Sequence, residues 1–134
     1  MGRKQARETA MQCLYQMDMH GEYTVDRIDA YIESIGQNDA DKIFVGQVVR
    51  NFIQHKDAVD QEISSHLKKG WKIDRIAKID LAILRIAMTE ILFNEDIPES
   101  VSINEAVNLS KKFSDDESSS FINGLLGATV GNKA

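Results

Sequence analysis

Apolar residues recur every three or four positions along most of this chain, which is the spacing of an amphipathic α-helix. The first such pattern covers residues 3–19 and ends at Gly21, a residue type that commonly terminates helices. Five side chains of this pattern share one arc of the helix and form its predicted core face: Ala6, Ala10, Cys13, Leu14 and Met17. A second pattern over residues 25–35 stops at Gly36. We therefore predict two helices in the first 36 residues.

A third pattern begins after Asn38 or Asp39, either of which can cap a helix, and continues to Lys68-Lys69-Gly70. About 30 residues is long for one helix in a small protein, so we expect a break near Lys56–Asp57. Apolar side chains at helical spacing support helices on both sides of this break: Phe44, Val48, Phe52, Val59, Ile63 and Leu67.

The next helix is expected to follow a turn closed by Trp71 and Ile73 and to run to about Phe93. Isoleucine and alanine surround the middle of this segment on nearly all sides. A helix that is apolar all round is a buried helix. We therefore predict that this helix is the most buried of the protein.

Pro98 separates that helix from two more helical patterns. Ser102-Ile-Asn-Glu105 has the form of a capping box, in which a serine hydroxyl and a glutamate carboxylate satisfy each other's backbone amides. Ser114-Asp-Asp-Glu117 repeats this form and predicts the start of the last helix. Because strand alternation, internal repeats and flexible linkers are not apparent, the predicted fold is all-α, with about seven helices in a single domain over residues 1–134.

The composition narrows the class of protein further. A chain of 134 residues can bury a core without metals or disulfides. The single cysteine, Cys13, cannot form an internal disulfide and points to a reducing compartment. No apolar run approaches the roughly 20 residues that span a bilayer, and residues 1–7 are polar and basic rather than apolar. We therefore predict a cytoplasmic protein without membrane segments.

Residue clusters that carry catalysis are not evident. His55 and His66 would lie about 16 Å apart along a continuous helix, which is too far for one metal ion. The chain has one further histidine, and it contains neither a glycine-rich phosphate loop nor a nucleophile elbow. We therefore expect no metal, no cofactor and no enzymatic activity.

The net charge of −5 disfavours nucleic acid, but the charges are unevenly distributed. Arg3, Lys4 and Arg7 are basic residues at a helix N-terminus, where the helix dipole favours acids. Lys4 and Arg7 share a sector of about 80° with Met11 and Tyr15, so a stripe along the helix edge changes from basic to aromatic. The cations either solubilise the helix start or contact a ligand, and both interpretations remain open.

The start of the last predicted helix has a similar ambiguity. Asp115, Asp116 and Glu117 crowd its first turn, where acids complement the helix dipole. Phe121 lies at the edge of the apolar arc, one turn after Glu117. Its ring either closes the core or remains exposed as a platform on which unpaired RNA bases stack.

A set of motifs is spread in a fixed order over nearly the whole chain. They are Arg3-Lys-Gln-Ala-Arg-Glu8, Leu14-Tyr15, Ile83-Leu-Arg-Ile-Ala87, Glu90, Ile103-Asn-Glu-Ala-Val107, Lys111, Phe113 and Phe121-Ile-Asn-Gly-Leu125. Through the order and spacing of these motifs, the sequence resembles the NusB family of bacterial transcription antitermination factors.

The resemblance implies an all-α fold of two packed three-helix subdomains. It also implies binding of boxA, a short single-stranded element of ribosomal RNA leaders, together with the ribosomal protein NusE. In this family the complex helps RNA polymerase to read through terminators. The expected partners are therefore boxA-containing RNA, NusE and the RNA polymerase antitermination complex.

The resemblance also implies functional residues, position by position. The implied RNA-binding residues are Arg3, Lys4, Arg7, Tyr15, Glu117 and Phe121. Asp80 matches a position near the NusE contact. Two residues depart from the common pattern, because Gln5 replaces a third basic residue and Glu117 replaces a common aspartate.

Two alternatives follow from the same observations. A related helical domain precedes the catalytic domain of some ribosomal RNA cytosine methyltransferases, but this chain has no cofactor-binding strand-loop-helix, which favours the stand-alone factor. The alternative from another class is a helical protein-interaction adaptor that does not bind RNA. Binding of a boxA-like oligonucleotide distinguishes the adaptor from the antitermination factor.

Overall fold

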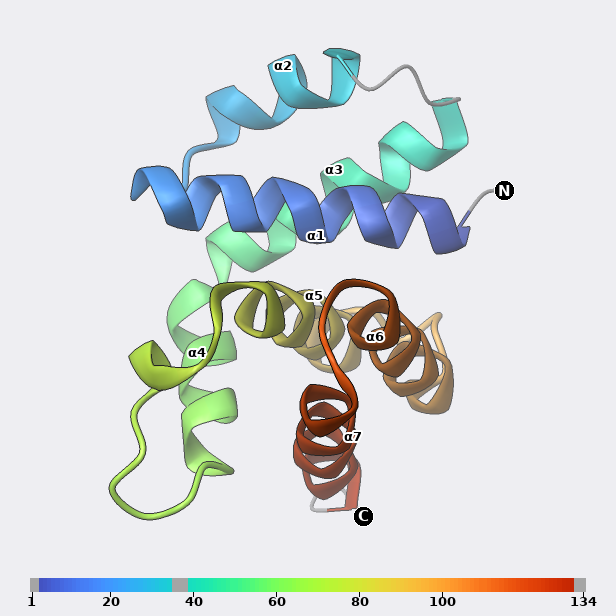
Figure 1. Ribbon diagram of the computed structural model, residues 1–134. Helices are drawn as coiled ribbons and strands as arrows, with labels where there is room; N and C mark the ends of the chain where they lie inside the picture. Colours follow the sequence, from blue (N-terminus) through green and yellow to red (C-terminus); the bar gives the residue numbers. More distant parts are fainter. Residues whose placement is uncertain (1–2, 35–38, 132–134) are drawn as a thin grey trace.

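Seven α-helices and one short 3₁₀ helix form the part of the chain that the computed structural model describes, residues 3–34 and 39–131 (Figure 1). Their bounds are α1 Arg3–His20, α2 Val25–Ser34, α3 Asp39–Gln54, α4 Lys56–Ser65, η1 Ile73–Arg75, α5 Lys78–Phe93, α6 Glu99–Phe113 and α7 Asp116–Gly131. Within these residues no strand is present, and the prediction of an all-α protein with about seven helices is confirmed.

The helices form two groups that meet at α5. Helices α1, α2 and α3 occupy the upper half of Figure 1, and α4 to α7 occupy the lower half. Helix α1 packs on α3 and α5, while α6 and α7 pack on each other and on α5. Helix α4 lies against α5 as well. This arrangement agrees with the two packed subdomains that the family resemblance implied, although the second group contains four helices, α4 to α7, rather than three.

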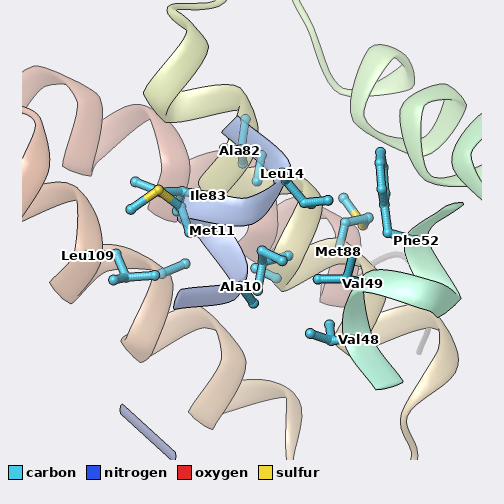
Figure 2. Close-up of a cluster of buried hydrophobic side chains, with 14 of the residues drawn as sticks. Ala10, Met11, Leu14, Val48, Val49, Phe52, Ala82, Ile83, Met88 and Leu109 are labelled. Carbon is cyan, nitrogen blue, oxygen red and sulfur yellow. The ribbon is translucent and has the colours of Figure 1, made fainter. Parts of the chain in front are cut away.

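The core is centred on α5, as its apolar sequence predicted. Every residue from Asp80 to Ile91 is buried. Figure 2 shows how side chains of four helices meet there: Ala10, Met11 and Leu14 of α1, Val48, Val49 and Phe52 of α3, Ala82, Ile83 and Met88 of α5, and Leu109 of α6. Burial of these side chains fixes the positions of the helix ends that carry the candidate site.

Two of the predicted helix ends are confirmed. Gly21 has a φ angle of +69°, and the amide of Glu22 donates to the carbonyl of Met17 at 3.0 Å. This is the Schellman arrangement, in which a glycine adopts the left-handed conformation just after the helix. The long third pattern is broken at His55, between α3 and α4, within two residues of the predicted break.

Both predicted capping boxes are wrong. Helix α6 begins at Glu99, so Ser102 lies inside its first turn and its hydroxyl donates to Glu90 of α5 at 2.8 Å. At α7 the cap is Asp115 rather than Ser114, because the Asp115 carboxylate accepts a hydrogen bond from the amide of Ser118 at 2.8 Å. At α6 the Ser102 hydroxyl bonds a residue of another helix instead of a backbone amide of its own helix. At α7 the neighbouring residue Asp115 takes the role that the pattern gave to Ser114.

Candidate nucleic-acid interface

Two of the three predicted cations at the start of α1 are accessible. Arg3 and Lys4 are exposed. The guanidinium of Arg3 lies 4.3 Å from the centre of the Phe44 ring, which orients it on the surface of α3. Lys4 lines a small depression together with Lys112 of α6. The start of α1 therefore presents two positive side chains to solvent.

Arg7 lies elsewhere than predicted, in the interior. Only 4% of it is exposed, and its Nε and Nη2 atoms donate to both carboxylate oxygens of Glu90 at 2.9–3.1 Å. Ser102 donates to the same carboxylate, so that α1, α5 and α6 are joined at one point. A bidentate buried pair of this kind is strong and geometrically specific. Arg7 is therefore occupied by Glu90 and is not available to a phosphate in this structure.

The basic-to-aromatic stripe along α1 is interrupted for the same reason. Met11 is fully buried, and Tyr15 is partly buried and packs against the core. The stripe was derived from helical angles alone, which do not reveal that α5 and α6 cover this edge. A glutamate within the apolar sequence of α5 was the available signal, since a buried carboxylate requires a charged partner.

A further cation beside α1 was missed by the sequence analysis. Lys112 in the last turn of α6 pairs with Glu8 of α1 at 2.9 Å, although the two residues are 104 positions apart. Lys111 and Lys112 suit this helix end, where the dipole favours positive charge. The side chain of Lys112 is 61% exposed and lies beside Lys4, but its charge is balanced by Glu8.

Glu117 and Phe121 belong to a second part of the candidate interface, on α7. Glu117 is exposed, and 38% of Phe121 is exposed. Both residues line a groove of about 630 Å³ between α7 and residues 66–77, which we call the α7 groove. The exposure of Phe121 favours the platform interpretation over a residue that closes the core.

Asp80 lines the same α7 groove. It is 6% exposed, and its Oδ2 atom accepts a hydrogen bond from the hydroxyl of Ser118 at 2.7 Å. Its Oδ1 atom is buried without a hydrogen-bond partner. The structure thus brings together Asp80, predicted to contact a protein, and Phe121, predicted to contact RNA. Helix α7 lies at the lower centre of Figure 1, whereas α1 starts at the right of the upper half, so the two parts of the candidate interface are on different helix groups.

The remaining reactive group is the thiol of Cys13. It is buried, and desolvation by burial raises its pKa to about 12. At neutral pH it is therefore protonated, which makes it a poor nucleophile. None of the helices in the described ranges is both long enough and apolar enough to cross a membrane.

Comparison with known proteins shows which family this chain is similar to. The model of the NusB family matches residues 4–130. The transcription antitermination protein NusB of Finegoldia magna is 44% identical over 133 residues, which cover 99% of this chain and 96% of that protein.

Two solved structures have the same fold. NusB of T. maritima has a TM-score of 0.85 at 26% identity and covers 96% of this chain and 90% of its own. A structure of the antitermination factors NusB and NusE in complex with double-stranded RNA matches with a TM-score of 0.85 at 28% identity, covering 95% of this chain and 94% of that one.

Proposed function

Because this chain belongs to the NusB family, we propose that it binds the boxA element of ribosomal RNA leaders together with NusE and thereby supports read-through by RNA polymerase. The family consists of transcription antitermination factors, so the chain is such a factor and not an enzyme. The similar structure that contains NusB, NusE and RNA supports a joint action of protein partner and RNA.

The observation that carries the proposal is the pair of exposed cations at the start of α1. Arg3 and Lys4 lie at a helix N-terminus in a chain whose net charge is −5. Lys112 of α6 lies beside Lys4, but Glu8 balances its charge. Backbone amides and the positive end of the helix dipole also favour anions at such a terminus. Phosphate groups of a single strand fit this surface.

The same surface explains why a partner is needed. Two cations that contact two phosphates give a salt dependence of only about −1.4 in log K per log salt for a single strand. This is a weak anchor for an acidic protein. A bound ribosomal protein that contacts the same RNA raises the effective concentration of the RNA at this site. We therefore infer that useful affinity is reached in the ternary complex.

The position of the protein partner is less constrained. Asp80 is the residue that the resemblance implied for the NusE contact, and this assignment stays a prediction. Because Asp80 is 6% exposed and lies within the α7 groove, a flat protein surface cannot reach it directly. Contact with Asp80 requires a narrow group that enters the groove.

The test is a fluorescence anisotropy titration of a boxA oligonucleotide with the protein, with and without NusE. We expect tight binding only with NusE, and we expect the Arg3→Ala/Lys4→Ala variant to reduce the salt slope by about 1.4. Arg50→Ala is a control for loss of one positive charge, since Arg50 pairs with Asp29 on another part of the surface. Absence of RNA binding even with NusE would support the adaptor instead.

A further inference from the structure

Two ion-pair clusters join α1 to α5, and their polarity is opposite. In the first cluster, Arg7 of α1 donates to Glu90 of α5, which also accepts a hydrogen bond from Ser102 of α6 at 2.8 Å. In the second cluster, Asp18 of α1 lies 3.6 Å from Arg85 of α5. Helix α1 therefore contributes the cation to the first cluster and the anion to the second.

The second cluster also includes residues of two other segments. The guanidinium of Arg85 donates to both carboxylate oxygens of Asp60 in α4 at 2.9 Å and to the hydroxyl of Tyr23 at 3.1 Å. Tyr23, in the loop after α1, donates in turn to Asp18. Lys78 at the start of α5 pairs with Asp18 at 3.0 Å. The second cluster thus joins the end of α1 to both α4 and α5.

The spacing of the two clusters matches one alignment of the helices. Arg7 and Asp18 are 11 residues apart, which is about 16 Å along α1. Their partners Glu90 and Lys78 are 12 residues apart on α5, about 18 Å, and follow in the opposite chain order. Sliding α1 by one turn, about 5.4 Å, would separate both of its charges from their partners at once.

Apolar packing specifies this alignment less strictly. Residues 80–91 of α5 are all buried, and a helix that is apolar on nearly all sides offers a neighbour several similar faces. The core side chains of α1 include the small Ala6 and Ala10 and the flexible Met11 and Met17. Methionine adapts to gaps of different shape, so these side chains can fill more than one alignment.

Charged residues are rare in the buried part of α5. Arg85 and Glu90 are the only ones between Leu81 and Ile91, and they are 5% and 1% exposed. A buried ion pair is often no more stabilising than an apolar pair of similar volume. It can nevertheless select one alignment of packed helices, because every other alignment leaves a buried charge without a partner.

We propose that the two clusters specify the single position of α1 on α5, and that Arg85 and Glu90 are thereby positioning residues for the cations at the start of α1. Arg3 and Lys4 are exposed in the first turn of this helix, so a displacement of α1 along its axis moves both of them by the same distance. The role in RNA binding rests on the proposed function, whereas the position of α1 is measured without RNA.

Double electron–electron resonance between two nitroxide labels measures this position directly. One label is attached to Gln12→Cys in α1 and the other to Gln61→Cys in α4, since both residues are exposed. Cys13 stays unlabelled, because it is buried and its pKa is raised to about 12. A second label pair, Gln61→Cys with Asn104→Cys in α6, measures a distance within the lower helix group and serves as the reference.

The decisive comparison is between apolar and conservative replacements. The apolar variant removes both clusters through five substitutions: Arg7→Met, Glu90→Leu, Asp18→Asn, Asp60→Leu and Arg85→Met. We expect its Tm to stay close to the original, since apolar side chains often replace buried ion pairs without loss, while the α1–α4 label distance spreads by up to about 5 Å, one helical turn. Arg85→Lys keeps the charge but not the bidentate geometry, so we expect a lower Tm with the original narrow distance.

Two further measurements complete the test. Asp29→Asn/Arg50→Met is the matched control, because it removes an exposed ion pair between α2 and α3 and should leave both label distances unchanged. The apolar variant keeps Arg3 and Lys4. It should nevertheless bind boxA RNA and NusE with a salt slope reduced toward that of Arg3→Ala/Lys4→Ala, because displaced cations no longer meet the phosphates.

A narrow, unchanged α1–α4 distance in the apolar variant would overturn the proposal, because apolar packing would then specify the position of α1. If that variant does not fold, Arg7→Met/Glu90→Leu is measured in its place and is judged in the same way. A spread distance with an unchanged RNA salt slope would overturn the positioning role. If the original protein binds no RNA even with NusE, the proposed function fails, while the label distances still decide how α1 is positioned.

Discussion

Replacing Arg7 by methionine removes the cation from the buried ion pair that joins α1, α5 and α6. Glu90, which is 1% exposed, would keep a buried charge with only Ser102 as a donor. Breaking one partner of a buried pair lowers stability by about 3–5 kcal/mol. With an unfolding entropy of about 2.1 cal/mol/K per residue, this lowers the Tm of a 134-residue protein by about 11–18 °C.

A double-mutant cycle isolates the contribution of the pair. Arg7→Met, Glu90→Leu and the double variant are compared by thermal and urea unfolding monitored by circular dichroism. Each single variant should be strongly destabilised, because each leaves one charge buried and unpaired. The double variant should recover most of the loss, since an apolar pair of similar volume is often as stable as a buried ion pair.

Two results would refute this reasoning. Additive single effects would show that Arg7 and Glu90 do not interact in solution as they do in the structure. The second result concerns RNA. If Arg7→Met, kept folded at low temperature, loses RNA affinity while Glu90→Leu retains it, then Arg7 contacts a phosphate and the original assignment from the sequence was right.

Three further predictions follow from the described geometry. Cys13 should resist thiol reagents at pH 8 in the folded protein and react once the protein is denatured. Burial raises the pKa of the thiol from 9.0 to about 12, so the contribution of the neutral thiol to the free energy of unfolding should be fully present below pH 9 and be lost between pH 9 and pH 12 in alkaline unfolding. Phe121→Ala should weaken RNA binding by about 1–3 kcal/mol in a titration, with a smaller loss in thermal stability because Phe121 is partly exposed; a normal affinity would contradict this. Glu117→Gln should strengthen RNA binding with only a small loss of Tm, because Asp115 and not Glu117 accepts the hydrogen bond from the Ser118 amide and only the interaction of Glu117 with the helix dipole is lost.

The helices were largely predictable because hydrophobic periodicity records which faces are buried. The break between α3 and α4 and the end of α1 at Gly21 were found from length and glycine alone. The capping boxes were not, because Ser102 lies where Glu90 of another helix competes for its hydroxyl. A local pattern contains no information about such a distant partner.

The candidate site was predictable only in part, for the same reason. Arg3 and Lys4 are exposed in the first turn of α1, but the burial of Arg7 depends on α5 and α6. The groove shared by Asp80, Trp71 and Phe121 joins segments that are 9 to 50 residues apart and differ in character. Lys68 and Arg75 precede α5 in the sequence, but that they line the same groove as Phe121 follows only from the packing of α7 on α5.

The central position of α5 has a consequence for how the protein unfolds. The helix provides the inner wall for α1 and α3 on one side and for α4, α6 and α7 on the other. Loss of α5 would expose the apolar side chains of both groups that pack against it. We therefore infer that the two groups melt as one cooperative unit, and that a ligand bound to either group stabilises the other.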